Sequence, residues 1–288
     1  YLKGMPIPDA ILEENIEYTL IKDGKGTESD PFIIKTVEDL VSIKNMITLA
    51  NSYYKLGNDL DLTEYISNLE TQSWEPIGTT ATPFIGTFNG NGYKISGLTI
   101  NGESNYLGLF GQNNGTIKDL TLENVNIVGN THVGTIVGYN KGTVKEIRVI
   151  SGNIEGKTER VGGLIGTSEG TIERCYATIP VIGELHVGGL VGYCGGTINK
   201  VYATGDVKGT TAVGGLLGHL ETTISNAYAT GKVEGQDKVG GLVGESGWRK
   251  AIVNSYAIGE VIGTTNVGCL LGFTNETGLT NSYFVPEV

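Results

Sequence analysis

The sequence is poor in cysteine, proline and histidine, and it has no long apolar run. Its 288 residues include 7 prolines, 3 histidines and 3 cysteines. Cys175, Cys194 and Cys269 are odd in number and show no Cys-x-x-Cys spacing, which argues against a disulfide framework. Because Cys175 and Cys269 occupy positions that other repeats fill with Val, Ala or Gly, we interpret them as small core residues. No stretch of about 18 apolar residues is present, so we expect no membrane insertion.

Basic charge is also scarce. Acidic residues outnumber basic ones by 31 to 20, which gives a formal net charge of −11. A protein that binds nucleic acid needs a basic stripe to neutralise phosphates, so nucleic acid is excluded as a partner. The same balance suits an extracellular surface. The chain begins at Tyr1 without a signal peptide, so if it is exported it is a trimmed mature form or part of a longer polypeptide.

Glycine, in contrast, is abundant and periodic. There are 45 glycines, about twice average usage, without the Gly-X-Y period of collagen. A short apolar motif between glycines recurs seven times, and its closing glycines are 27, 28, 26, 26, 26 and 28 residues apart. The copies are Gly108–Gly111, Thr135–Gly138, Gly163–Gly166, Gly189–Gly192, Gly215–Gly218, Gly241–Gly244 and Cys269–Gly272.

Each repeat holds three short apolar segments, with turns between them. In the second segment Val201 and Ala203 alternate with Lys200, Tyr202 and Thr204, which is the period of a half-buried strand. No segment has the length or the period of a helix. We therefore predict an all-β fold, a right-handed parallel β-helix (β-solenoid) of 26–28-residue coils with three strands each. One predicted core column runs Ile117, Val144, Ile172, Ile198, Ile224, Ile252 and Leu279.

The glycines are interpreted as structural. A coil turns a corner every few residues, and backbone with φ > 0 is cheapest for glycine, so we expect the glycines at such corners. A pair such as Gly188-Gly189 also lets two backbones approach closely.

The N-terminal third differs from the repeats. Residues 1–25 are polar and acidic and predict an extended or tethering segment. Residues 26–105 predict a capping region with the first coils and one helix at about 36–50, which begins after Thr36 with Asp39 as its capping-box partner. Residues 106–288 form the repeats. A solenoid needs covered ends, so the helix is expected to act as an N-terminal α-helical cap.

The Gly-Leu-aliphatic-Gly motif with its follow-on Tyr202-Ala203-Thr204-Gly205 resembles the GLUG-motif repeat family. Residues 26–34, 54–62 and 86–100 resemble the N-terminal region of the same family, so the resemblance covers about residues 24–288. Thr135 and Cys269 depart from the motif by replacing its first glycine. The resemblance implies a β-helical fold and export, as in bacterial cell-surface proteins and adhesins. It also implies kinship with the non-catalytic part of metallopeptidases that cleave immunoglobulin A1, and it carries no catalytic residue across.

Candidate chemistry is sparse. No His-Glu-x-x-His is present among His132, His186 and His219. His132 and His186 share one repeat position two coils apart, roughly 10 Å, which is too far to share a metal. We interpret the histidines as surface residues at corners, and we predict no metal site, no cofactor and no catalytic residue.

One column of aromatic residues stands out. Period two places it on the outer face, because the neighbouring positions belong to core columns. It consists of Tyr176, Tyr202, Tyr228, Tyr256 and Tyr283, preceded by Thr121 and Arg148. Ring stacking between coils would stabilise this column, and an exposed aromatic strip could also contact a ligand.

These features predict a non-enzymatic binding or spacer module of an exported bacterial surface protein, an adhesin, located at the cell surface or outside the cell. Host or cell-surface glycans or proteins are the expected partners, and a monomer within a longer polypeptide is the expected state. Two alternatives remain open. The chain could be the non-catalytic region of a larger secreted metallopeptidase, or a polysaccharide-cleaving β-helix enzyme.

Overall fold

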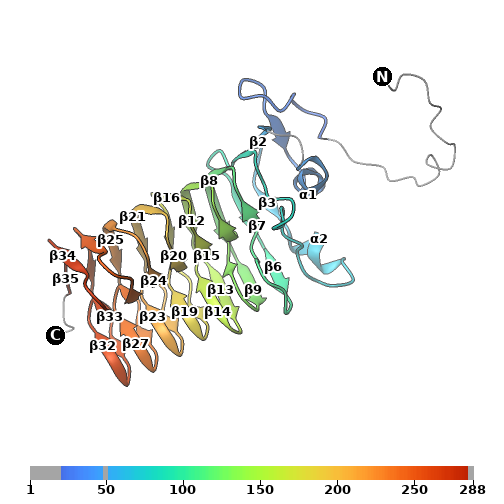
Figure 1. Ribbon diagram of the computed structural model, residues 1–288. Coiled ribbons are helices and arrows are strands. Elements are labelled where there is room, and N and C mark those ends of the chain that lie inside the picture. The colour runs from blue at the N-terminus through green and yellow to red at the C-terminus, as the bar shows by residue number, and fades with distance from the viewer. Residues whose placement is uncertain (1–20, 48–50, 285–288) are drawn as a thin grey trace, which may run out of the picture.

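The computed structural model describes residues 21–47 and 51–284 and forms a parallel β-solenoid whose coils stack along one axis (Figure 1). The predicted fold class is confirmed. Most of the predicted tethering segment, residues 1–20, lies outside the described residues, as do residues 48–50 within the predicted helix.

A full coil contains four strands, so the prediction of three is wrong. The coil of β19–β22 shows the order: one strand in each of the sheets named here 4, 2, 1 and 3. The difference arises because a further strand, β19 (Leu185–Gly188), precedes the glycine motif. The Gly189-Leu190 step of the motif forms a corner between β19 in sheet 4 and β20 in sheet 2.

Sheet 1 comprises β1 (Phe32–Ile34), β2 (Tyr53–Leu56), β3 (Leu60–Asp61), β4 (Thr87–Asn89), β5 (Lys94–Ser96), β8 (Thr116–Glu123), β12 (Thr143–Val149), β16 (Thr171–Glu173), β17 (Tyr176–Ala177), β21 (Thr197–Ala203), β25 (Ile224–Ala229), β29 (Ala251–Val253), β30 (Tyr256–Ala257), β34 (Gly278–Thr280) and β35 (Tyr283–Phe284). Sheet 2 comprises β7 (Phe110–Asn113), β11 (Val137–Asn140), β15 (Ile165–Ser168), β20 (Val191–Cys194), β24 (Leu217–Leu220), β28 (Val243–Ser246) and β33 (Leu271–Thr274). Sheet 3 comprises β6 (Thr99–Asn101), β9 (Val125–Gly129), β13 (Gly152–Gly156), β18 (Val181–Ile182), β22 (Val207–Lys208), β26 (Val233–Glu234) and β31 (Val261–Ile262). Sheet 4 comprises β10 (Val133–Gly134), β14 (Glu159–Gly162), β19 (Leu185–Gly188), β23 (Thr211–Gly214), β27 (Asp237–Gly240) and β32 (Thr265–Gly268).

The predicted core column exists in the predicted register. Ile117 pairs with Val144, Val144 with Ile172, and the pairing continues to Leu279. The column is fully buried from Ile117 to Ile252 and becomes exposed at Leu279, on the last coil. Burying one such side chain contributes about 1.5–3 kcal/mol, so the stacked columns supply the main stabilisation of the solenoid.

The motif glycines do not have positive φ, so that interpretation is wrong. In the described residues the left-handed positions of the repeats are filled mainly by larger residues. One column in sheet 4 consists of Tyr106, His132, Arg160, His186, Ala212, Lys238 and Asn266, and one in sheet 1 of Asp119, Glu146, Arg174, Lys200, Asn226, Asn254 and Asn281. In sheet 1 this conformation places two outward residues in succession, which lets Ile198 and Val201 both face the core.

Close backbone approach, the other expectation for the glycines, is confirmed. A Cβ on Gly192 would lie 2.5 Å from both Arg160 C and Val161 N, in the preceding coil. The later closing glycines from Gly138 to Gly272 meet the preceding coil in the same way, whereas Gly111 meets Gly78 O. Sheets 2 and 4 therefore pack back to back along a seam of glycines, each strand of sheet 4 lying against the sheet 2 strand of the next coil.

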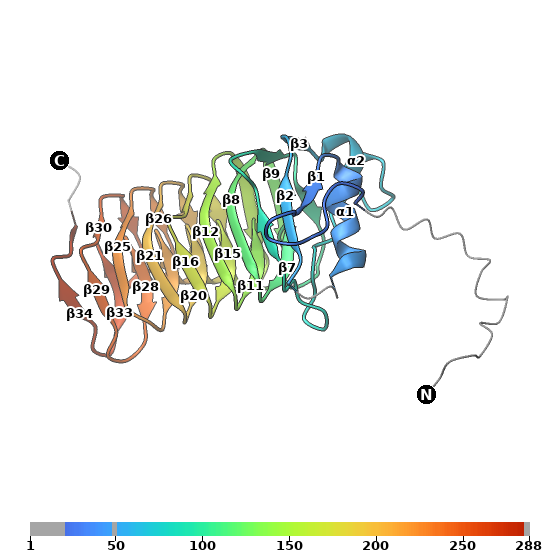
Figure 2. The ribbon, with the colours of Figure 1, turned by 90° about the horizontal axis from the view of Figure 1, so that it is seen from above.

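Two helices of the described residues lie at the N-terminal end of the solenoid (Figure 2). Helix α1 (Val37–Met46) begins after Thr36, whose side chain accepts a hydrogen bond from Asp39 N while the Asp39 carboxylate accepts one from Thr36 N. It buries Leu40 and Ile43 against the first coils. Helix α2 (Thr63–Ser67) is a single short turn. Neither of these helices has the length or apolar content needed to cross a bilayer.

Candidate functional site

The five predicted tyrosines form a continuous stack on the outer face of sheet 1, which we call the tyrosine strip. Parallel pairing places Tyr176, Tyr202, Tyr228, Tyr256 and Tyr283 in one register. Successive ring centroids are 4.5, 4.6, 5.1 and 5.6 Å apart, and the rings are within 10° of parallel. Each pair contributes about 0.5–1.5 kcal/mol beyond its burial, so the strip also stiffens the solenoid.

Stacking decides what the strip can offer to a ligand. The ring faces cover one another, so only ring edges and hydroxyl groups face outward along the row. The pKa of Tyr202 is raised to about 12, chiefly by burial and secondly by the neighbouring hydroxyl groups of Tyr176 and Tyr228. The strip therefore presents a row of neutral hydroxyl groups that can donate and accept hydrogen bonds at about the spacing of the coils.

Charged residues surround the N-terminal end of the strip. A shallow hollow of about 600 Å³ lies there, lined by Tyr176, Tyr202, Asp119, Glu146, Arg148 and Arg174. Arg174 Nη2 lies 2.9 Å from Glu146 Oε1, and Arg148 Nη1 lies 3.8 Å from Asp119 Oδ1. The hollow thus joins aromatic edges to paired charges, a combination that suits a polar ligand.

A second hollow, of about 680 Å³, lies near the helical cap. Its lining includes Tyr65, Trp74, Ile100 and Tyr106. Trp74 is buried and donates from Nε1 to Leu109 O at 3.2 Å, and the Lys44 ammonium lies 4.8 Å from its ring centroid. The indole is thus fixed by the fold rather than free to meet a ligand.

A second row of polar and aromatic side chains, which the sequence interpretation missed, runs along the seam between sheets 4 and 2. We call it the seam ladder. It combines the left-handed column of sheet 4 with the outward column of sheet 2, which consists of Gln112, Tyr139, Thr167, Tyr193, His219, Glu245 and Phe273.

Contacts that join the two columns from one coil to the next follow one rule: a residue of the sheet 4 column meets the sheet 2 residue one coil and seven positions later. His132 Nδ1 lies 2.8 Å from Thr167 Oγ1. The Arg160 guanidinium lies 5.3 Å from the Tyr193 ring centroid, and the His186 and His219 rings are 5.0 Å apart. The offset arises because each sheet 4 strand packs on the next coil. Other contacts lie within one coil, such as that between Lys238 and Glu245.

All three histidines lie in the seam ladder, and the interpretation as surface residues is wrong for His132, which is buried, while His186 and His219 are half-buried. His132 is 7% exposed and the His219 side chain 14% exposed. Burial, with Arg160 second, lowers the pKa of His132 to about 4. The pKa of His186 is also lowered to about 4, chiefly by burial and secondly by the nearby His219.

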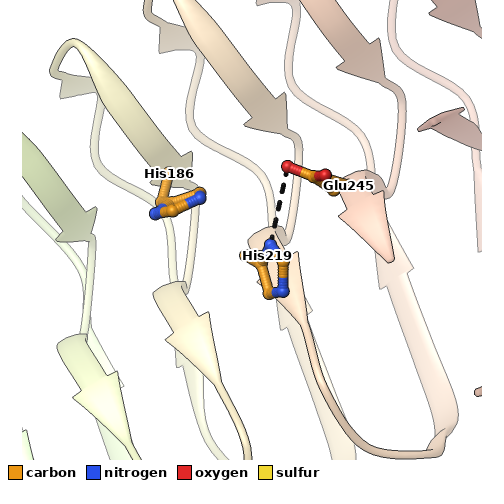
Figure 3. Close-up of side chains that lie close together, drawn as sticks. All are labelled: His186, His219 and Glu245. Atoms are coloured by element: carbon orange, nitrogen blue, oxygen red, sulfur yellow. Dashed lines mark ion pairs between the residues drawn. The ribbon is translucent and has the colours of Figure 1, made fainter. Parts of the chain in front are cut away.

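His186, His219 and Glu245 converge on one point from three successive coils (Figure 3). One potential ligand atom from each lies within 4.8 Å of the others. The distance argument about His132 and His186 compared residues of one column, whereas the contact joins two columns. A separation of 33 residues, one coil of 26 plus seven, was the signal available in the sequence.

The cysteines divide by position. Cys175 and Cys194 are buried, and burial raises the pKa of both thiols to about 12, so they are inert core residues. Cys269 is exposed, so its interpretation as a core residue is wrong. It lies on the last described coil, where no further coil covers it.

Comparison with known proteins identifies the repeat. The sequence model of the GLUG motif matches residues 209–234, which span β23, β24, β25 and β26. A candidate Gly-rich membrane protein of Evansella cellulosilytica is 40% identical over 102 residues, 34% of this chain and 12% of that protein. Halomucin of Haloquadratum walsbyi is 33% identical over 165 residues, 54% of this chain and 2% of that protein. The chain thus spans a small part of the length of both relatives.

The fold also has a solved counterpart. The crystal structure of a candidate immunoglobulin A1 protease from Bacteroides ovatus superposes with a TM-score of 0.61 at 18% identity, over 93% of this chain and 80% of that one. At this identity the likeness concerns the fold. Together with the motif match, it confirms the predicted resemblance: the chain carries the GLUG motif of the GLUG-repeat proteins on a parallel β-solenoid.

Proposed function

We propose that the chain is a non-enzymatic binding module of an exported bacterial surface protein, and that the tyrosine strip is its ligand-contacting surface. The carrying observation is the strip itself: five aromatic residues in register on an exposed sheet face. Surface aromatic rows of this size are uncommon unless they serve contact, because exposed apolar area favours association.

The relatives support an extracellular setting. They are named as a Gly-rich membrane protein and as halomucin, and both are several times longer than this chain. A stiff solenoid inside a long polypeptide would act as a spacer that holds the strip away from the cell. We expect the module to be monomeric in solution, as one segment of such a polypeptide.

A polar, extended ligand fits the strip best. Hydroxyl groups and ring edges bind sugar hydroxyls or a polar protein surface, while a planar apolar ligand would need the ring faces, which are stacked. The charged pairs at the N-terminal hollow add polar contacts beside Tyr176 and Tyr202. Glycans of a host or of a neighbouring cell are therefore the first class to test.

The test is a glycan array probed with the intact chain, followed by affinity measurements on the glycans that bind. Tyr202→Phe with Tyr228→Phe removes two hydroxyl groups and keeps the stack. If each hydroxyl contributes about 1 kcal/mol to binding, affinity falls roughly 30-fold while thermal stability changes little.

Two further variants complete the design. Tyr202→Ala with Tyr228→Ala removes the ring edges as well and should weaken binding further. Lys208→Ala with Glu234→Ala, an exposed ion pair on sheet 3, is the matched control and should bind normally. Normal glycan binding by both tyrosine pairs would reduce the strip to a structural role.

A second candidate function rests on the fold likeness to the Bacteroides ovatus protein: the chain would be a non-catalytic region of a larger secreted metallopeptidase. A longer gene product with His-Glu-x-x-His outside this chain, and proteolysis abolished by changing that motif, would favour this reading over an adhesin.

A further inference from the structure

We propose that His186, His219 and Glu245 form a binding site for a divalent transition-metal ion, with zinc as the natural occupant. The site is separate from the tyrosine strip, because its residues come from β19, β24 and β28 in sheets 4 and 2.

The geometry is close to that of a bound ion. The three ligand atoms lie within 4.8 Å of one another. Zinc bonds to nitrogen and oxygen are about 2.0–2.2 Å long, so tetrahedral ligands lie about 3.3–3.5 Å apart. The side chains would need to close by up to about 1.5 Å, which torsions of the glutamate and rotations of the imidazoles can supply.

Glu221, a second carboxylate near His219, lies on the side of the imidazole away from Glu245 and fixes the ring orientation. His219 Nε2 lies 2.9 Å from Glu221 Oε1, so the tautomer that donates to this carboxylate carries its proton on Nε2. Nδ1 then carries a lone pair directed toward Glu245 Oε2, 3.7 Å away, a distance too long for a hydrogen bond. A carboxylate that holds the far nitrogen of a histidine is the arrangement found behind metal ligands.

Two nitrogen atoms of this cluster are unsatisfied. The Nδ1 atoms of His186 and His219 are both buried without a hydrogen-bond partner. Glu245 Oε1 accepts from Lys238 Nζ at 2.7 Å, which leaves Oε2 for another partner. Buried polar atoms are nearly always paired, and a cation between two lone pairs and a carboxylate oxygen would satisfy all three.

The small side chain at position 212 leaves room for the ion. Ala212 lies between His186 and Lys238 in the sheet 4 column and opposite Glu245 under the contact rule of the seam ladder. The other members of that column carry larger side chains. A lysine or arginine at this position would place its own cation among the ligands.

The donor set indicates the kind of metal. Two imidazoles and one carboxylate suit zinc and its neighbours, whereas calcium and magnesium prefer oxygen ligands alone. Three protein ligands leave a fourth position for water. Since the ligands belong to three successive coils, the ion would tie these coils together and stabilise the middle of the solenoid.

The test is zinc titration of the 288-residue chain by calorimetry, with cobalt absorption as a spectroscopic check. We expect one ion per chain, and a rise in the melting temperature of the chain on adding zinc. His186→Asn, His219→Gln and Glu245→Gln should each weaken zinc binding at least 100-fold and abolish that rise. Asn is chosen at 186 because it tolerates the left-handed backbone.

His132→Asn is the matched control. His132 occupies the same repeat position with the same left-handed backbone, but its Nδ1 lies 2.8 Å from Thr167 Oγ1 and its Nε2 3.4 Å from Arg160 Nη1. The His132→Asn variant should bind zinc with the affinity of the parent chain. Cys269→Ser tests the exposed thiol. The proposal is overturned by a parent Kd above about 100 µM, by unchanged affinity in His219→Gln, or by loss of binding in Cys269→Ser.

Discussion

Replacing Gly192 by alanine tests the seam on which the whole coil arrangement depends. The new Cβ would lie 2.5 Å from Arg160 C, 2.5 Å from Val161 N and 2.7 Å from Arg160 Cα. Ordinary contacts begin near 3.4 Å, so β14 would have to move by about 0.9 Å. That strand cannot move freely, because it is paired with β10 on one side and β19 on the other.

Forced backbone shifts of this kind cost about 3 kcal/mol. For a domain of this size, 3 kcal/mol corresponds to a fall in melting temperature of about 6–12 °C, measured by circular dichroism or calorimetry. Because solenoid coils are stabilised by their neighbours, the transition should also broaden.

Gly195→Ala, three residues away in the same coil, is the matched control. Gly195 is exposed, its φ is not positive, and a Cβ there would meet its nearest neighbour at 3.6 Å. The register places Glu221 at the equivalent position of the next coil. The free energy of unfolding of this control variant should be unchanged or should rise by up to about 1 kcal/mol. Equal melting temperatures for the two variants would refute close approach as the reason for the motif glycines.

Three further predictions concern buried polar residues. The pKa of His132 in the folded chain, about 4, is below its unfolded value of 6.5, so its contribution to stability is complete above pH 6.5 and is lost as pH falls toward 4. The free energy of unfolding falls by about 2 kcal/mol at pH 5 for this reason. The urea midpoints at pH 7 and pH 5 should therefore differ less in His132→Asn than in the parent chain. The variant has no imidazole at this position for the Arg160 cation or the Glu159 carboxylate to act on. Asn140→Ala breaks a buried hydrogen-bond chain across three coils and should lower the free energy of unfolding by about 2–4 kcal/mol, and an unchanged urea midpoint would contradict this. Thr135→Val removes the buried hydroxyl that donates to a carbonyl of the next coil at 2.7 Å and should cost about 1–3 kcal/mol by the same measurement, whereas Thr135→Ser should cost less.

The sequence predicted those features that repeat within a column. Stacked coils place each residue over its counterpart 26–28 positions later, so the Ile117–Leu279 column and the tyrosine strip could be read directly from the period. The capping box at Thr36 was also local enough to identify, because its partners are three residues apart.

Features that depend on how a coil folds against its neighbour were not predictable in this way. The fourth strand, β19, ends at Gly188, just before the apolar motif, and the corner at Gly189-Leu190 separates it from β20. The backbone conformation of Ala212 is set by packing, since an alanine side chain disfavours positive φ. The His186–His219 contact needed both facts, because it joins two sheets and two coils.

The seam ladder is the part of this architecture where chemistry can vary without cost to the fold. Its positions are defined by backbone alone: positive φ in sheet 4 and a glycine contact beneath sheet 2. Side chains there point away from the apolar columns, so tyrosine, histidine, arginine and lysine all occur in one column. Residues one coil and seven positions apart therefore meet on successive coils, whichever side chains they carry here. His186, His219 and Glu245 are one set of residues that meet in this way. His132 has the same backbone conformation as His186, but both of its ring nitrogens already have polar partners.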